Sequence, residues 1–193
     1  QALVKDKRFP ALYMLPAAQT RNKDDITTEQ VMEICEQLKP DFDFIFIDCP
    51  AGIEQGFRNS IAAADRAIVV TNPEVSAVRD ADRIIGLIEA EEKGPAKLII
   101  NRLKPEMVKR GDMLATEDVL ELLAVDLLGV VPEDESVLTG GNRGAPVALD
   151  PRSQAGQAFR NISRRLQGYE VPFLELDNHN GFFHKIGKLF RGG

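Results

Sequence analysis

The sequence predicts an α/β fold in which helices flank a mostly parallel sheet. Short apolar segments typical of buried strands alternate along the chain with segments of helical periodicity. Several of the predicted strands are apolar at nearly every position, as expected when both faces of a sheet are covered. Because strands separated by helices form right-handed crossovers, neighbouring strands should run parallel.

The predicted elements follow one another in a regular order. Thr27 or Thr28 caps the first helix, which ends near Pro40 and should bury Ile34 and Leu38. The expected strands are 12–15, 42–47, 67–71, 97–101 and 127–132. After that first helix, the expected helices are one that starts near Ser76 and includes Ile88, one over 116–123 and one from about 153 to 166.

Composition narrows the class of protein. With 193 residues, 28% charged and 44% hydrophobic, the chain is an ordinary globular protein with a substantial core. Its net charge of −6 argues against a general nucleic-acid binder, which needs a basic face. Two cysteines, Cys35 and Cys49, make neither a disulfide framework nor a metal site, so we expect a reducing, intracellular setting.

An acid and a glycine turn follow the predicted strand 42–47. Asp48 stands at the carboxyl end of that strand, where ligands of open α/β sheets bind. The next residues include Pro50 and Gly52, and a free backbone N–H at Gly52 would suit a terminal phosphate beside magnesium. Asp48 would equally well cap the next helix. This segment alone leaves both interpretations open.

The last residues form a basic amphipathic pattern after a predicted linker, residues 170–180. The tail, residues 181–193, carries three basic residues and no acid, which leaves −9 for the other residues. Its apolar positions fall on one helical face: Phe182, Phe183, Ile186, Leu189 and Phe190. Its basic positions fall on the other: Lys185, Lys188 and Arg191. This pattern favours a helix lying in an anionic membrane interface over one that packs on the body.

The free energies involved predict that one tail binds the membrane weakly. Burying five such side chains would yield on the order of 7–15 kcal/mol, most of which partial immersion and helix ordering remove. Two tails on a dimer would hold much better, because the second insertion is intramolecular. Control of dimerisation would then control membrane residence.

Taken together, residues 48–54, 71–83, 110–114 and 129–137 and the tail resemble the MinD family. These membrane-associated ATPases place the bacterial or plastid division site. The resemblance covers nearly the whole chain and implies a P-loop nucleotide-hydrolase fold followed by a membrane-binding helix.

The resemblance also implies residue roles. Asp48 matches the Walker B acid that holds Mg²⁺ through water, and Gly52 matches a glycine facing the γ-phosphate of ATP. Asn101 is similar to the adenine-reading residue, and the alternative interpretation is a polar residue that ends a strand. The residues expected to line the base with their main chain are Pro132, Glu133 and Asp134.

Partners follow from the same resemblance. They are a second copy of the chain in the presence of ATP, a MinC-like division inhibitor, a MinE-like activator and anionic lipid, without nucleic acid. Glu54 resembles a dimer-face position. The helix carrying Arg79, Asp80 and Asp82 faces partner proteins or is a solvated charged face. The expected location is cytoplasmic, peripheral on the inner face of the cell membrane, or the equivalent plastid membrane.

One departure from the family is large. Its glycine-rich Walker A loop, with two lysines and a threonine, has no match here, and the cluster 140–144 lacks Lys-Thr. The chain also begins at Gln1 and its first strand lacks a βαβ partner. We therefore interpret residues 1–169 as the carboxyl-terminal part of an ATPase domain, incomplete at its amino end. Without the lysines we expect this chain alone neither to bind ATP well nor to hydrolyse it.

Two alternatives stay open, and a third is disfavoured. A plasmid or chromosome partition ATPase of the same superfamily would need a basic surface for DNA. A non-catalytic membrane-binding module would describe this chain if no Walker A loop is supplied. An iron–sulfur carrier would need bridging cysteines, which Cys35 and Cys49 do not convincingly offer.

Overall fold

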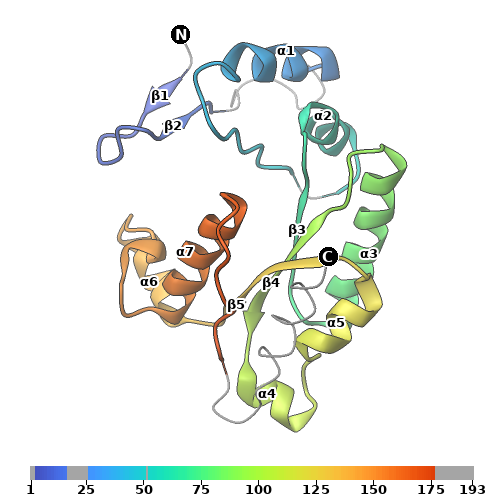
Figure 1. Cartoon of the computed structure of the whole chain (residues 1–193), viewed down its shortest axis with the longest axis vertical. Coiled ribbons are helices and arrows are strands. Elements are labelled where there is room, and N and C mark those ends of the chain that lie inside the picture. Colours follow the sequence, from blue (N-terminus) through green and yellow to red (C-terminus); the bar gives the residue numbers. More distant parts are fainter. Residues whose placement is uncertain (1–2, 17–25, 51, 177–193) are drawn as a thin grey trace. The chain divides into compact units, whose positions relative to one another are not determined.

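The structure is a computed structural model that describes residues 3–16, 26–50 and 52–176. The chain divides into two compact units (Figure 1), the first unit Gln1–Ala63 and the second unit Ala64–Gly193. The α/β class predicted from the sequence is present in the second unit, as three parallel strands with helices on both faces.

The first unit contains two short strands and two helices. Strands β1 (Val4–Lys5) and β2 (Tyr13–Met14) pair antiparallel, so the predicted strand 12–15 is present but does not join the parallel sheet. Helix α1 (Thr28–Leu38) begins at the predicted cap, because Thr27 accepts from the N–H of Gln30 and the Gln30 side chain accepts from the N–H of Thr27.

Helix α2 (Gln55–Ala63), which the sequence pattern did not predict, packs on α1. The buried side chain of Asn59 accepts a hydrogen bond from Thr28 at 2.7 Å and donates one to the carbonyl of Ile26 at 2.8 Å. Cys35 is the buried residue of α1, whereas the predicted core residue Ile34 is 40% exposed. Pairing with one helix covers only a narrow stripe of α1.

The predicted strand over 42–47 is wrong. Residues 44–50 form neither helix nor strand, and the side chains of Phe44 and Phe46 are 52% and 73% exposed. No strand among the described residues pairs with this stretch. Its apolar residues are covered only in part, since Phe42 packs on Tyr13 and Ile45 and Ile47 are half-buried. The rings of Phe44 and Phe46 stack on each other, with centroids 6.2 Å apart. Asp48 therefore does not end a strand.

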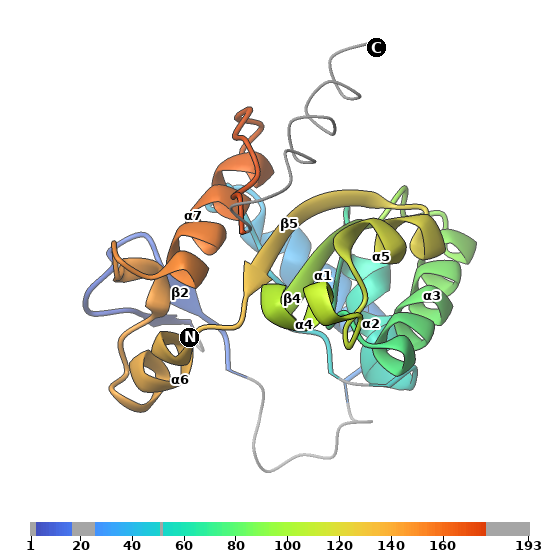
Figure 2. The ribbon, with the colours of Figure 1, turned by 90° about the horizontal axis from the view of Figure 1, so that it is seen from below.

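The second unit is built on a parallel sheet of order β3-β4-β5. Its strands are β3 (Ile68–Thr71), β4 (Lys97–Leu103) and β5 (Asp126–Pro132). The connections contain α3 (Val75–Ala90), α4 (Pro105–Arg110) and α5 (Thr116–Leu123). Helices α3 and α5 cover one face of the sheet, and α7 (Gln154–Leu166) covers the other (Figure 2).

The core lies on both faces of β4 and β5. Leu98 and Ile100 are 0% exposed, because β4 is paired on both edges. On the α7 side, Leu128 and Val131 pack against Ala155, Ala158 and Ile162. β3 is an edge strand among the described residues, and the side chain of Val70 is 59% exposed there although the strand is apolar at nearly every position.

Two short helical segments that the sequence pattern did not predict link β5 to α7. They are α6 (Glu135–Asn142) and the 3₁₀ turn η2 (Val147–Leu149). Ser153 then caps α7 by accepting from the N–H of Gly156 at 2.9 Å, as the predicted start of that helix requires.

Candidate functional site

The three parallel strands of the second unit present their carboxyl ends at one edge of the sheet, here called the carboxyl edge. Thr71 ends β3 opposite Ile100 of β4, and Leu103 of β4 lies opposite Pro132 of β5. Two residues predicted to contact a nucleotide base, Asn101 and Pro132, are thereby brought to adjacent strands. In parallel α/β sheets this edge is where ligands bind.

A β-bulge shapes the carboxyl edge. The register pairs Ile100 with Val130 but Leu103 with Pro132, so Asn101 and Arg102 together oppose a single residue of β5. Arg102 has a φ of 58°, a left-handed conformation that is uncommon outside glycine. Bulges of this kind re-aim side chains and are frequent beside functional sites.

Arg102 bridges the ends of β4 and β5 through Glu133. Its Nε donates to Oε2 of Glu133 at 2.8 Å and its Nη2 to Oε1 at 3.3 Å. The hydrogen bond and charge of Glu133 raise the pKa of Arg102, and in return the bond from Arg102 lowers the pKa of Glu133. The N–H of Glu133 also donates to the carbonyl of Leu103 at 2.9 Å, which holds the loop after β5 against β4.

Asp134 caps two helices at once. Its carboxylate accepts from the N–H of Ser136 at 2.8 Å at the start of α6. It also accepts from the hydroxyl of Ser153 at 2.6 Å and the N–H of Ala155 at 3.3 Å at the start of α7. Hydrogen bonds from Ser136 and Ser153 lower the pKa of Asp134 to about 2. Because this side chain is fully engaged, residues 132–134 offer a ligand chiefly their main chain.

The residues predicted to handle phosphate lie in the first unit. Asp48 is exposed in the irregular stretch 44–50, and Gly52 has a φ of 98°, a conformation that favours glycine. Glu54 is exposed immediately before α2. The structure thus gathers the predicted base-lining residues at one edge and leaves the roles of Asp48, Gly52 and Glu54 as predictions.

The predicted partner residues lie on the solvent side of α3. Arg79, Asp80 and Asp82 are exposed, while the opposite side of the helix buries Val78 and Ile85. This placement suits both a partner surface and a solvated face. The membrane residues of the tail lie outside the described residues.

Residues 3–16, 26–50 and 52–176 contain neither a membrane-spanning helix nor a metal-binding cluster. No helix there is long and apolar enough to cross a membrane. Within the same ranges no group of three or more His, Cys, Asp or Glu side chains is placed to hold a metal ion.

Sequence reasoning missed Arg102 and the role of Ser153 as a donor to Asp134. The link from Arg102 to Glu133 depends on a register shift between strands, which no local pattern specifies. Ser153 carried a usable signal, because a serine directly before a helix is a preferred cap. Its second bond, to Asp134, joins residues far apart in the sequence and had no signal.

Comparison with known proteins agrees with this geometry. The family model for cellulose biosynthesis protein BcsQ matches residues 10–164. The septum site-determining protein MinD of Synechocystis is 53% identical over 195 residues, which cover 100% of this chain and 73% of that protein. The chain belongs to the MinD family. MinD of Bacillus subtilis is 49% identical over 98% of this chain and 72% of its own length.

Solved MinD structures have the same fold. The MinC:MinD cell division protein complex of Aquifex aeolicus matches with a TM-score of 0.82 and 43% identity, covering 90% of this chain and 69% of that one. MinD of Pyrococcus horikoshii, complexed with Mg-ADP, matches with a TM-score of 0.72 and 28% identity, covering 86% and 67%. The family resemblance and the ATPase fold class predicted from the sequence are therefore confirmed.

Proposed function

We propose that this chain is the nucleotide-base, partner and membrane-binding part of a MinD ATPase that controls where the division septum forms. The observation that carries the proposal is the 53% identity to a MinD protein across the whole chain. The carboxyl edge supports it, because Asn101 and the main chain of residues 132–134 are brought together there by β4 and β5.

The nucleotide would be ATP with Mg²⁺. A side-chain amide has both donors and an acceptor, so Asn101 can pair with the edge of an adenine, while backbone groups after β5 line the ring. Asp48 is exposed, and among the described residues it belongs to no cluster of three or more metal-ligating side chains, so it would offer a metal ion one carboxylate. Mg²⁺ keeps several waters and uses one or two carboxylates plus phosphate oxygens, so this donor set fits it. The P. horikoshii relative is complexed with Mg-ADP.

Phosphate binding would require a glycine-rich loop with lysines, which this sequence does not contain. Supplied with such a segment, the chain would form an ATP-bound homodimer through a face that includes Glu54. Two tails would then insert together into anionic lipid on the inner face of the cell membrane, while the remaining net charge of −9 opposes binding by the body.

The partners would be a MinC-like inhibitor and a MinE-like activator. The MinC:MinD complex of A. aeolicus supports the first of these. The exposed charges Arg79, Asp80 and Asp82 on α3 are the proposed contact surface. The activator would stimulate hydrolysis and release the dimer.

Vesicle co-sedimentation tests the proposal. The chain is joined to the amino-terminal segment of Synechocystis MinD and mixed with anionic vesicles in ATP or ADP. We expect binding in ATP only, loss of that binding in Phe190→Glu, which places a charge on the apolar face of the tail, and loss of the nucleotide dependence in Asp48→Asn. The chain without the added segment should show no ATP turnover. Equal sedimentation in ATP and ADP would contradict the nucleotide-gated mechanism.

A further inference from the structure

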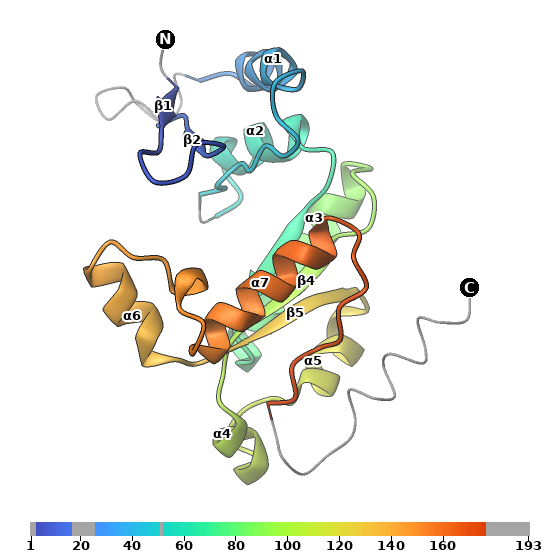
Figure 3. The same ribbon diagram turned by 60° about the vertical axis from the view of Figure 1, so that its left-hand side comes forward.

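We propose that residues 170–176, here called the strap, are clasped by Arg165 so that the tail departs from the carboxyl edge of the sheet rather than from the end of α7. The strap lies within the predicted linker and contains no helix or strand (Figure 3). The effect of the strap on membrane attachment rests on the proposed function, whereas the contact between the strap and Arg165 does not.

The clasp is a single guanidinium with three backbone acceptors. Arg165 donates from Nε to the carbonyl of Val171 at 3.0 Å and from Nη2 to that of Pro172 at 2.8 Å. Its Nη1 donates to the carbonyl of Leu128 in β5 at 2.9 Å. The same group lies over the ring of Phe173, 4.1 Å from its centroid. Strap, helix and sheet are therefore joined through one side chain.

Arg165 reaches β5 because α7 lies close to the sheet. A Cβ on Gly129 would overlap the side chain of Ile162 in α7, so the missing side chain lets the helix approach the strand, and Nη1 of Arg165 lies at ordinary contact distance from the same position. Burial lowers the pKa of Arg165, and no ion pair with an acid is found for it among the described residues. A half-buried cation that bonds only carbonyls is costly unless those bonds are well made.

A tight turn sends the strap back along α7. Gly168 has a φ of 87°, and the N–H of Tyr169 donates to the carbonyl of Arg164 at 3.0 Å, which ends the helix in a left-handed cap. The chain then passes Arg165 and continues toward the amino end of α7.

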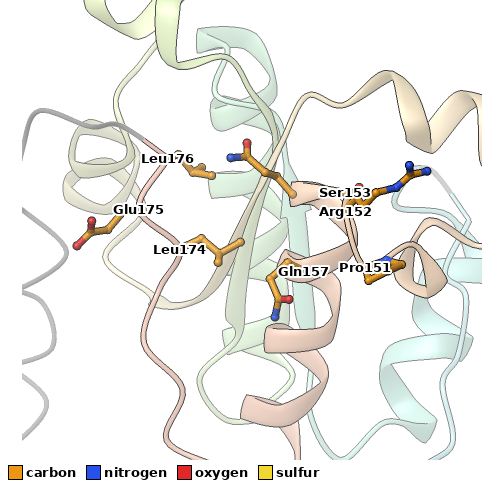
Figure 4. Close-up of a pocket in the computed structure, with 8 residues that line it drawn as sticks. Pro151, Arg152, Ser153, Gln157, Leu174, Glu175 and Leu176 are labelled. Atoms are coloured by element: carbon orange, nitrogen blue, oxygen red, sulfur yellow. The ribbon is translucent and has the colours of Figure 1, made fainter.

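The far end of the strap meets the carboxyl edge. Leu174 packs against the core cluster beneath α7. A cavity of about 190 Å³ lies between strap and helix (Figure 4), lined by residues that include Leu174, Leu176, Ser153 and Gln157. Ser153 donates to Asp134, the last of the predicted base-lining residues. The end of the strap and Ser153 therefore line the same cavity, and Ser153 is hydrogen-bonded to Asp134 of the candidate nucleotide site.

The strap shortens the tether of the tail. Five residues, 177–181, separate it from Phe182, whereas release of the strap would leave fourteen, 168–181. Because effective concentration falls roughly as the −3/2 power of linker length, release would weaken the second insertion of a dimer by about fivefold.

Limited proteolysis of the full chain with a glutamate-specific protease tests the strap. Cleavage after Glu175 is followed by mass spectrometry in Arg165→Met, with Arg164→Met as the matched control, since Arg164 is exposed and has the same charge. We expect cleavage to be about tenfold faster in Arg165→Met, because three charge-assisted hydrogen bonds are lost, and unchanged in the control. Equal rates in the two variants would overturn the clasp.

A second variant distinguishes loss of the strap contact from general unfolding of the protein. Phe173→Ala removes the ring that packs on the guanidinium of Arg165 and leaves the sequence of α7 unchanged. Tyr169→Ala, which removes an exposed aromatic side chain before the strap, is its control. Faster cleavage in Phe173→Ala alone, at an unchanged urea midpoint, supports the strap; equal rates in this pair refute it.

Vesicle binding separates the two proposals. In the extended protein with ATP, Arg165→Met should bind anionic vesicles about fivefold more weakly than Arg164→Met. If neither the wild type nor the control binds vesicles, the proposed function fails while the cleavage result stands. If Arg165→Met binds as tightly as its control, the strap does not set the tether.

Discussion

The two units contain similar apolar strand sequences with opposite outcomes. In the second unit, Leu98 and Ile100 of β4 are fully buried between two parallel neighbours. In the first unit, Phe44 and Phe46 lie in an irregular stretch and remain largely exposed. An alternating apolar pattern therefore shows which side chains a segment could bury, whereas their actual burial depends on the strands and helices packed around it.

The largest expected effect separates these two segments directly. Leu98→Ala should lower the free energy of unfolding by about 2–5 kcal/mol, since it removes a fully buried side chain and leaves a cavity. Phe46→Ala, although it deletes a larger side chain, should change that free energy by less than about 0.5 kcal/mol. Urea denaturation of both variants measures the difference. Comparable losses would mean that residues 42–47 form a buried strand after all.

A smaller effect compares the helix caps of the two units. Asp134→Ala should destabilise the second unit by about 2 kcal/mol, because one carboxylate caps both α6 and α7. Thr27→Ala removes the cap of α1 alone and should cost about 1 kcal/mol or less, confined to the first unit. Hydrogen exchange of the individual helices distinguishes the two.

The Asp134 cap should also depend on pH. Its pKa falls from 3.8 to about 2 on folding, so the carboxylate stabilises the fold above about pH 4 and loses this contribution as the pH falls toward 2. In Asp134→Asn, the urea midpoint should therefore fall less between pH 5 and pH 3 than it does in the wild type. An equal fall in both proteins would exclude Asp134 as its source.

The smallest expected effect concerns surface ion pairs, where the two units should not differ. Arg102→Met breaks the pair with Glu133 in the second unit and should cost less than about 1 kcal/mol, because the Arg102 side chain is 62% exposed. Lys39→Met, which breaks the exposed pair with Glu36 in the first unit, is the matched control. A loss of several kcal/mol in Arg102→Met alone would show that the bulge depends on the pair.

Local sequence signals predicted much of the second unit. The helix 116–123 is where the sequence placed it, and the helix expected from about Ser153 begins there. In the first unit, the predicted cap Thr27 is also present. Strand β4 runs two residues beyond the predicted 97–101, through the bulge at Arg102. Of the two polar residues predicted at strand ends, Asn101 lies at the carboxyl edge of the sheet, whereas Asp48 does not end a strand, and the roles of both stay predictions.

The missing parts have physical causes. The strand 42–47 failed because pairing is not a local property. Helix α4 is too short for a clear helical period, and α6 contains two glycines, which weaken a helical pattern. The double role of Asp134 and the clasp of Arg165 join residues distant in the sequence, which one sequence alone does not reveal. The phosphate, dimer and membrane roles remain predictions.

The contact between Arg165 and the carbonyl of Leu128 has a mechanical consequence. Tension applied beyond Leu176 meets the strap first, and its load passes through one guanidinium into β5. Because β5 is hydrogen-bonded along β4, part of that force is passed on to the sheet instead of acting only on the last turn of α7.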